Sequence, residues 1–342
     1  MIRVRSKATC FFTFYPIFIF YKQMKNLITT FLFAFALLPV FCGAQQQPHN
    51  TQFMYYKLGY NPAFAGSQET PCISCIVRQQ WLGPNGAPSI QAVTFNMPLM
   101  NERVGIGANV MRHSIGITTL YNVDMAYAYR VRLGQGMLGI GVQGSLRSLT
   151  NDFNETVAVQ SKPDDHTIPA SNESKFSFNF GTGLYFNSNR FYLGLSAPRL
   201  LKTSIDFNAN DNIVSREVQH LYLMSGYTAT VSDDLKVRPQ VLFKYAQHAP
   251  ADADINVNFL IKDQFLAGLT YRLGGNKVKD RLGESLDLLF GMQLAENLMF
   301  GFSYDFTLSD LRQFTSGSME VSLHYCIGQL SGNAEFENPR FF

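Results

Sequence analysis

The fold is decided by residues 121–130, which read YNVDMAYAYR. Successive side chains of a β-strand point to opposite faces, so the odd-numbered residues share one face and the even-numbered residues the other. The odd face, from Tyr121 to Tyr129, is apolar and aromatic, whereas the even face, from Asn122 to Arg130, is small or polar. A tilted strand of about ten residues is long enough to cross a bilayer. The stretch therefore predicts a membrane-spanning strand with one face toward lipid.

The same alternation recurs along the chain, for example over residues 176–186, 255–261, 298–306 and 319–325. We count about fourteen such segments, an even number as bacterial barrels require. They lie near 72–82, 89–98, 103–113, 119–131, 136–149, 174–186, 190–197, 216–231, 235–246, 253–262, 264–273, 284–294, 297–308 and 315–327. Strands of a β-sandwich are more often five or six residues long, so the length favours a barrel over a sandwich or a propeller.

The predicted connections alternate in length. Tight turns are expected at 101–102, 133–135, 187–189, 232–234, 262–263 and 295–296. Longer connections are expected at 83–89, 114–118, 150–173, 198–215, 247–252, 274–283 and 309–314. Outer-membrane barrels have short periplasmic turns and longer outer loops. The expected fold class is therefore all-β, a transmembrane antiparallel outer-membrane β-barrel with both termini in the periplasm.

Composition and charge exclude several classes of protein. The chain has 342 residues, of which 46% are hydrophobic, 14% aromatic and only 15% charged, so it is not a disordered chain. The first 44 residues hold five basic residues and no acidic one. Without them, 28 − 5 = 23 basic residues stand against 25 acidic ones, a net charge of −2. A chain near neutrality has no basic footprint for nucleic acid, which we exclude as a partner.

The N-terminal region is read as an export signal. After Met24, the sequence has a basic Lys25, an apolar run over 27–41 and small residues before Gln45, which predicts a signal peptide over 24–44, cleaved after Ala44. A lipoprotein signal ending at Cys42 is the alternative, although Phe41 is bulky where such signals need a small residue. Residues 1–23 are interpreted as an upstream extension. No later window has the ~18 uncharged apolar residues of a spanning helix.

Two motifs near the ends of the mature chain are more specific than the strand pattern. The first group consists of Asn61, Pro62, Ala63, Gly66 and Ser67, followed by Arg78, Gln80, Trp81, Gly86, Ala87 and Pro88. The second closes the chain with Asn338, Pro339, Arg340, Phe341 and Phe342. Both resemble the signatures of the PorP/SprF family of outer-membrane proteins. The resemblance covers the mature chain, but between its ends it depends on barrel patterning.

The resemblance implies a function that composition does not show. Proteins of this family cooperate with the type IX secretion and gliding machinery of Bacteroidetes-type bacteria. They aid export or surface attachment of cargo, often an adhesin, that bears a type IX C-terminal domain. We therefore expect a non-enzymatic barrel in the cell outer membrane, without cofactor, whose partners are the lipid bilayer, secreted cargo and other secretion-system components. Its expected parts are an N-terminal periplasmic or lumenal segment over 45–71, a barrel over 72–328 and a periplasmic tail over 329–342.

Two other functions stay open. Charges on the predicted inner face favour a diffusion porin or solute channel. A water-filled lumen whose charges balance one another explains the same residues. They are Lys236, Arg238, Lys244, Asp254, Asp287, Asp305 and Glu320. An outer-membrane hydrolase would need a catalytic constellation. The run Asp164-Asp165-His166 has no accompanying nucleophile motif, so ordinary loop chemistry explains it better.

Cysteines and acidic loop residues give two further candidates. Cys72 and Cys75 have the spacing of a disulfide or half of a metal site, a pair that the family resemblance does not lead us to expect. Residues i and i+3 of a strand face opposite sides roughly 10 Å apart, so a Cys72–Cys75 bridge requires that the strand begin after Cys75. Cys326 is expected to lie alone on the polar face of the last strand.

A weak calcium-loop pattern occupies one of the longer predicted connections. Its candidate ligands, spaced as in part of an EF-hand, are Asp206, Asn208, Asn210 and Glu217. The glycine that such loops need at the sixth position is replaced by Asp211, and flanking helices are not predicted. Solvation of an ordinary oxygen-rich loop explains the same residues.

Overall fold

The structure is a computed structural model that describes residues 49–153, 172–203, 218–247, 249, 251–274 and 283–327. All of these belong to one compact unit, Cys42–Phe342. Its strands are β1 (Cys72–Gln79), β2 (Ser89–Leu99), β3 (Val104–Ile115), β4 (Thr118–Leu133), β5 (Gly136–Asn151), β6 (Glu173–Ser188), β7 (Phe191–Ala197), β8 (His220–Tyr227), β9 (Ala229–Ser232), β10 (Leu235–Ala246), β11 (Asp252–Ile261), β12 (Phe265–Leu273), β13 (Ser285–Ala295), β14 (Leu298–Thr307) and β15 (Ser318–Cys326).

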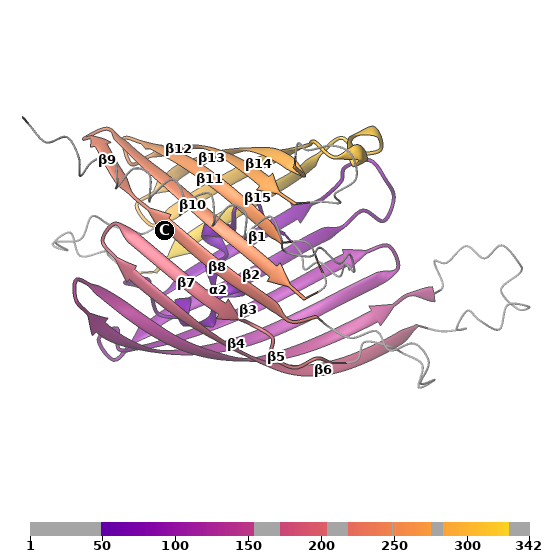
Figure 1. The fold of residues 1–342 in the computed structure, drawn as a ribbon, viewed down its shortest axis with the longest axis horizontal. Helices are drawn as coiled ribbons and strands as arrows, with labels where there is room; N and C mark the ends of the chain where they lie inside the picture. The colour runs from indigo at the N-terminus through magenta and orange to yellow at the C-terminus, as the bar shows by residue number, and fades with distance from the viewer. Residues whose placement is uncertain are drawn as a thin grey trace, which may run out of the picture. The chain divides into compact units, whose positions relative to one another are not determined.

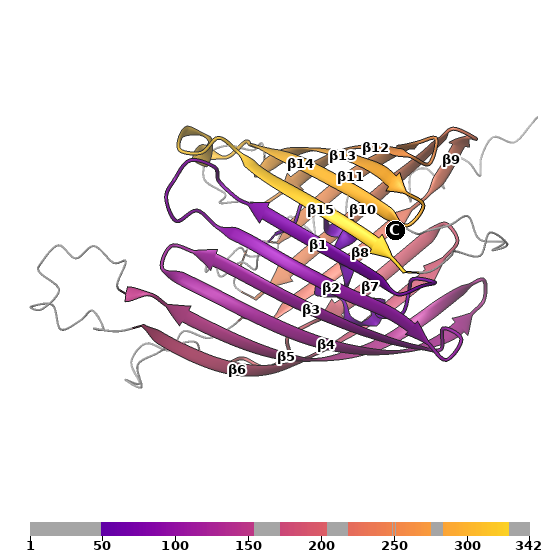
Figure 2. The same ribbon diagram turned by 180° about the vertical axis from the view of Figure 1, so that it is seen from behind.

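These strands form one closed antiparallel barrel (Figures 1 and 2). Each strand pairs with its neighbours in sequence, and β15 pairs with β1 to close the ring. β8 and β9 both pair with β10 and are separated only by Thr228, whose amide donates instead to the Arg190 carbonyl at 2.7 Å. They are therefore one interrupted strand, and the predicted fourteen-stranded barrel is confirmed.

The alternation in residues 121–130 has the predicted physical meaning. Tyr121, Tyr127 and Tyr129 on the outer face expose about half of their surface, at 49%, 48% and 50%. Asn122 and Ala128 on the inner face expose 1% and 0%. The apolar side chains thus face outward, where a bilayer would bury them, and the small and polar side chains face the lumen. The described part of the chain contains no helix with the length and apolar character needed to cross a membrane.

The two ends of the barrel differ in their connections. We call the end with the tight turns near 100–103, 134–135, 189–190, 233–234, 262–264 and 296–297 the short-turn mouth. The opposite end, with the connections 80–88, 247–251, 274–284 and 308–317 among others, is the long-connection mouth. One expectation was wrong. The connection predicted over 114–118 is a tight turn at 116–117, because β3 and β4 continue pairing as far as Ile115 and Thr118, and Gly116 supplies the positive φ of 53°.

Candidate functional site

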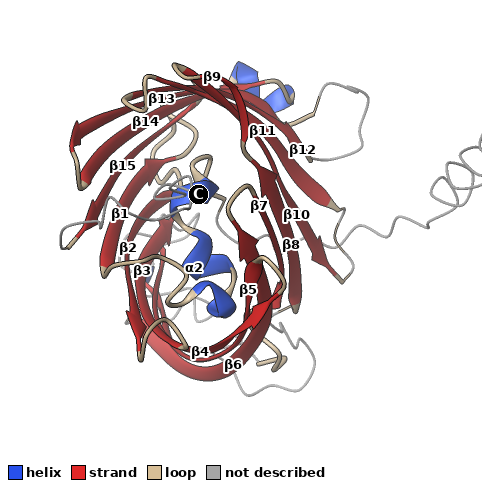
Figure 3. Ribbon diagram, turned by 90° about the vertical axis from the view of Figure 1, so that its left-hand side faces the viewer, coloured by secondary structure: helices blue, strands red, loops and turns tan. Residues whose placement is uncertain are grey.

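A folded segment lies inside the barrel, and we call its residues 49–70 the lumenal segment. It contains three short helical turns, η1 (Phe53–Tyr55), α2 (Lys57–Tyr60) and η2 (Pro62–Phe64). Seen along the barrel, α2 lies within the ring of strands (Figure 3). The apolar side chains of this segment are each at most 8% exposed: Phe53, Met54, Tyr55, Tyr56, Leu58, Tyr60, Ala63, Phe64 and Ala65.

The sequence from Asn61 to Gly66 explains how this short segment holds its shape. The Asn61 side chain accepts a hydrogen bond from the Ala63 amide at 2.9 Å, which caps η2, and Pro62 occupies the first helical position. The Asn61 side-chain amide donates to the Leu184 carbonyl of β6 at 2.9 Å. Gly66 adopts a φ of 69° and donates its amide to Asn96 on β2 at 2.5 Å. The segment is thus bonded to two separate strands of the wall, β6 and β2.

Glycines on the inner face of the wall make room for this backbone. A Cβ on Gly141 of β5 would overlap with Ala63 and Pro62 backbone atoms, and one on Gly105 of β3 would overlap with the Ala65 carbonyl. A Cβ on Gly139 would lie 2.7 Å from the Ala63 oxygen. The small side chains on the polar face of these strands are therefore small because a second backbone packs against them.

Aromatic rings and one lysine fill the space beside α2. The Tyr56 and Tyr60 rings meet edge to face at 5.5 Å, and Tyr60 contacts Tyr222 of β8 at 5.2 Å between centroids. The Lys57 ammonium lies 3.8 Å from the centroid of the Tyr192 ring, within the range of a cation–π contact. Burial, reinforced by the positive charge of Arg238, lowers the pKa of Lys57 well below its ordinary value.

Near the long-connection mouth, eight buried charged side chains surround the start of the lumenal segment. We call this set the charged collar, and each member is at most 7% exposed: Arg78, Lys244, Asp252, Asp254, Arg272, Asp287, Asp305 and Glu320. Short ion pairs join the strands: Arg272 of β12 pairs with Asp254 of the neighbouring β11 at 2.7 Å, and Arg78 of β1 reaches past β15 to Asp305 of β14 at 2.6 Å. The interpretation of these charges as groups in a water-filled lumen is wrong for the collar, because the lumenal segment covers them.

The segment completes this network through its own backbone and side chains. The Thr51 and Gln52 amides donate to the Glu320 carboxylate at 2.9 and 2.8 Å, and the Thr51 hydroxyl donates to Asp305 at 2.8 Å. Arg78 and Arg272 in turn donate to the Thr51 hydroxyl oxygen, at 2.9 and 3.2 Å. A carboxylate that accepts two backbone amides and an arginine bond is fully engaged, so the segment is part of the collar rather than a loose occupant.

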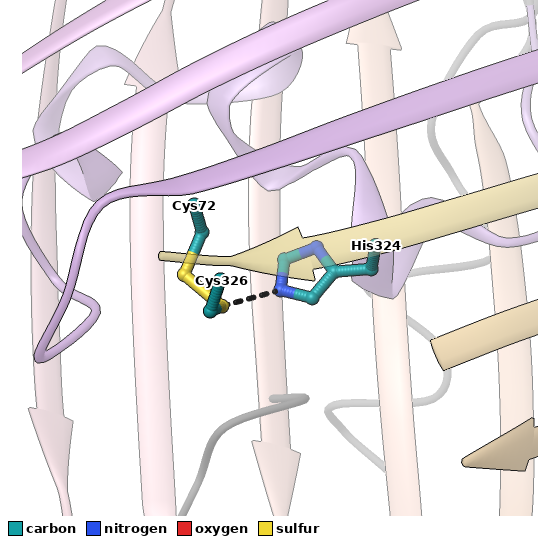
Figure 4. Close-up of side chains that lie close together, drawn as sticks. All are labelled: Cys72, His324 and Cys326. Carbon is teal, nitrogen blue, oxygen red and sulfur yellow. Dashed lines mark hydrogen bonds between the residues drawn. A yellow bond between two sulfur atoms is a disulfide. The ribbon is translucent and has the colours of Figure 1, made fainter. Parts of the chain in front are cut away.

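The first and last strands are joined by a disulfide. Cys72 of β1 and Cys326 of β15 are direct register partners and are bonded through their sulfur atoms (Figure 4). His324 lies beside them, with its Nε2 3.4 Å from the Cys326 sulfur, and its Nδ1 is 2.6 Å from the Ser74 hydroxyl. The expected isolation of Cys326 and the Cys72–Cys75 alternative are therefore both wrong. The strand begins at Cys72, so Cys75 points to the other face and is a free thiol.

The lumen opens again at the short-turn mouth. A cavity of about 630 Å³ lies there, bounded by residues 101–103, 129–132 and 187–189 and by the end of the lumenal segment. The buried Arg130 guanidinium donates to the Gly66 carbonyl. Ser67 and Glu69 line the same cavity. The segment thus occupies the lumen between the charged collar and this cavity.

Comparison with known proteins adds the family. The model of the type IX secretion system membrane protein PorP/SprF matches residues 42–325. This chain belongs to the PorP/SprF family. A closed barrel with an apolar outer face, in a family of membrane proteins, is located in the outer membrane. No curated protein matches the chain.

Solved structures with a similar fold have low sequence identity. The Ralstonia pickettii toluene transporter TbuX is 13% identical, with 78% of this chain and 92% of that chain covered and a TM-score of 0.45. The Acinetobacter baumannii outer membrane protein Omp33 is 6% identical, with coverages of 77% and 100% and a TM-score of 0.44. The Escherichia coli outer membrane phospholipase A is 9% identical, with coverages of 78% and 97% and a TM-score of 0.38.

The residues singled out in the sequence fall into separate places. Asn61 to Ser67 lie in the lumenal segment, and Arg78 lies in the charged collar. Gln80, Trp81, Gly86, Ala87 and Pro88 belong to the β1–β2 connection, where Gln80 donates its amide to the Pro88 carbonyl at 2.8 Å. The calcium-loop candidates, the run 164–166 and the closing residues 338–342 lie outside the described residues.

Sequence reasoning missed the partners of these motifs. Thr51 carries no motif of its own, yet it is bonded to four residues of the collar. Asp252 and Arg272 also escaped attention as site residues. The inward parity of Arg272 on its predicted strand, and of Asp252 one residue before the predicted start of another, is a signal that could have identified them, because a charged side chain that faces a lumen needs a partner.

Proposed function

We propose that this protein is a surface partner of the type IX secretion and gliding machinery in a Bacteroidetes-type bacterium. In this proposal, it aids export or cell-surface attachment of cargo, such as an adhesin, that bears a type IX C-terminal domain. It acts through binding, without catalysis or a cofactor. Family membership supports the system in which it works.

The observation that carries the proposal is the lumenal segment. Its bulky side chains are buried against the wall between the charged collar and the short-turn mouth, where a diffusion porin would need an open path. A barrel with a bonded segment in its lumen is a rigid support, and proteins commonly place binding residues on loops held by such supports. The longer connections over 150–173 and 198–215 are therefore the surface that we propose for cargo.

Deletion of residues within either connection tests the proposal. We expect each deletion to release a surface protein into the medium while the barrel still assembles, as judged by its heat-modifiable gel mobility. Pull-down from solubilised outer membranes should recover a protein with a type IX C-terminal domain from the unmodified barrel and from neither deletion variant. A matched control carries an alteration of the tight turn at 262–263, at the opposite mouth, and should retain the cargo.

One rival function is a solute channel, which the charges on the inner face predicted from the sequence favour, because charged rings select ions in barrels. This rival predicts a large stable conductance in planar bilayers and an unchanged surface proteome after the loop deletions. Recovery of no partner together with such a conductance would replace the proposal with the channel.

A further inference from the structure

The lumenal segment has a direction that its contacts define. At its start, His49 lies 3.1 Å from Asp252 and 2.6 Å from the Lys244 ammonium, and these two residues flank the long 247–251 connection. At its end, Gly66 donates to Asn96, and Glu69 lines the cavity beside the tight turn at 101–103. The chain therefore runs through the lumen from the long-connection mouth to the short-turn mouth.

The position at which the chain leaves the lumen and begins β1 agrees with this direction. β1 begins at Cys72, and the Ile327 amide after β15 donates to the Pro71 carbonyl at 2.7 Å, so both strand ends lie at the short-turn mouth. From there β1 runs back toward the long-connection mouth and brings Arg78 to the charged collar. Thr51 and Arg78 meet in the collar because the chain has traversed the lumen once and the wall once.

We infer that the N-terminal segment is threaded through its own barrel, with His49 at the long-connection mouth and Glu69 at the short-turn mouth. The N-terminal end of the lumenal segment then belongs to the same surface as the 247–251 connection, across the membrane from the start of β1. This differs from the expectation that both termini lie at the short-turn side. It does not depend on the proposed cargo function.

Two features hold the threaded arrangement in place. The collar binds the segment through the Thr51 and Gln52 amides and through the Thr51 hydroxyl, all of which are buried. The wall cannot part beside the exit, because Cys72 and Cys326 join its first and last strands. A closed ladder leaves no lateral opening, so the barrel must close around the segment during assembly.

Side-specific labelling of intact cells tests the threading. The probe is a membrane-impermeant maleimide-biotin, and the variant is Gln47→Cys in a Cys75→Ser background. Reference variants in the same background are Ala249→Cys for the long-connection mouth and Asp263→Cys for the short-turn mouth. We expect Gln47→Cys to be labelled with Ala249→Cys in intact cells and Asp263→Cys to be labelled only after permeabilisation. Heat-modifiable mobility confirms that each variant is folded.

The inference would be overturned if Gln47→Cys were labelled under the same condition as Asp263→Cys, intact or permeabilised, and not under the condition that labels Ala249→Cys. This holds whichever mouth faces outward. A second variant covers the case of a shielded thiol at position 47. It carries an epitope and a Gly/Ser linker inserted before Gln47, and antibody should bind it on the same side as an epitope placed at Ala249. Antibody binding on the side of Asp263 would likewise overturn the threading.

Discussion

Arg78 serves both the barrel wall and the segment inside it. Its guanidinium is 1% exposed and contacts Asp305 at 2.6 Å, Glu320 at 3.2 Å and the Thr51 hydroxyl at 2.9 Å. Two carboxylates on neighbouring strands would repel one another at this depth without a cation between them. This side chain therefore links two carboxylates of the collar to the lumenal segment.

Replacement of Arg78 by Met should destabilise the protein by about 3–5 kcal/mol, because the buried Glu320 loses its cation and the buried Asp305 keeps only the 3.7 Å contact with Arg272. Urea unfolding of detergent-solubilised protein measures the change. Lys236→Met is the matched control, since the Lys236–Asp263 pair is exposed and its loss should cost less than about 1 kcal/mol. Equal effects of the two changes would show that the collar is not the stabilising network described here.

Gly141→Ala tests the close approach of the segment to the wall. The added methyl group would overlap with backbone atoms of Pro62 and Ala63, which cannot rotate away, so we expect a loss of about 1–3 kcal/mol. Protease resistance of residues 53–64 should fall in parallel. The control, Gly144→Ala, lies on the same strand with its nearest neighbours at 3.8 Å and should be neutral. If Gly141→Ala left the free energy of unfolding unchanged, the close packing of the segment on Gly141 would be contradicted.

The buried Lys57 should make the free energy of unfolding depend on pH. Because burial lowers its folded pKa, the unfolded chain binds more protons than the folded chain between that lowered value and the ordinary 10.5. The free energy of unfolding should therefore rise with pH in this window. Between about pH 7.5 and 9.5, below the ordinary tyrosine pKa, wild type should gain stability relative to Lys57→Met. Parallel profiles of the two proteins would reject this role.

At the scale of elements, the junction of β1 and β15 combines three functions. It closes the barrel, it places the disulfide, and it carries the end of the lumenal segment, where the Gln68 side chain lies 3.1 Å from His324. The ring of Tyr55 lies 6.3 Å from the His324 ring on the lumenal side. A change in this junction should thus affect the wall and the segment together.

Cys326→Ser should lower the free energy of unfolding by about 2–5 kcal/mol under oxidising conditions, because the cross-link joins residues 254 positions apart and restricts the unfolded chain. Wild type treated with a reductant should match the variant. Cys75→Ser is the control and should unfold like wild type, within about 0.5 kcal/mol. Peptide mapping that finds Cys72 linked to Cys75, or all three thiols free, would be incompatible with this closure.

The disulfide also shows what the sequence could predict at this scale. Alternation in the last strand predicted the polar, inward face of Cys326, but its pairing with Cys72 of the first strand is a property of the closed ring. An even number of antiparallel strands brings the start of the first strand and the end of the last strand to the same mouth. The closure of the ring could therefore have suggested Cys326 as the partner of Cys72. The prediction was wrong because it considered Cys75, a neighbour in sequence, as the partner of Cys72 and did not consider Cys326 at the end of the last strand.

The whole molecule is a barrel whose outer surface was predictable and whose interior was less so. Membrane-facing alternation is local, and it predicted all fourteen strands, including the interrupted one formed by β8 and β9. The interior depends on which segment fills the lumen, and the helical turns of residues 53–64 are too short for a periodic signal. The glycines at 105, 139 and 141 carry no separate signal in the sequence, although a backbone packed against them is the physical reason for their size.

Removal of the lumenal segment should convert the sealed barrel into a conducting one. A variant lacking residues 49–66 loses the aromatic side chains between the collar and the short-turn cavity, while the strands that form the wall are unchanged. We expect small conductance from the full-length protein in planar bilayers and a large stable conductance from the deletion variant. Asn61→Ala, which loses the cap of η2 and the bond to Leu184, should show brief openings between these limits. A large conductance from the full-length protein, equal to that of the deletion variant, would mean that the segment does not seal the lumen.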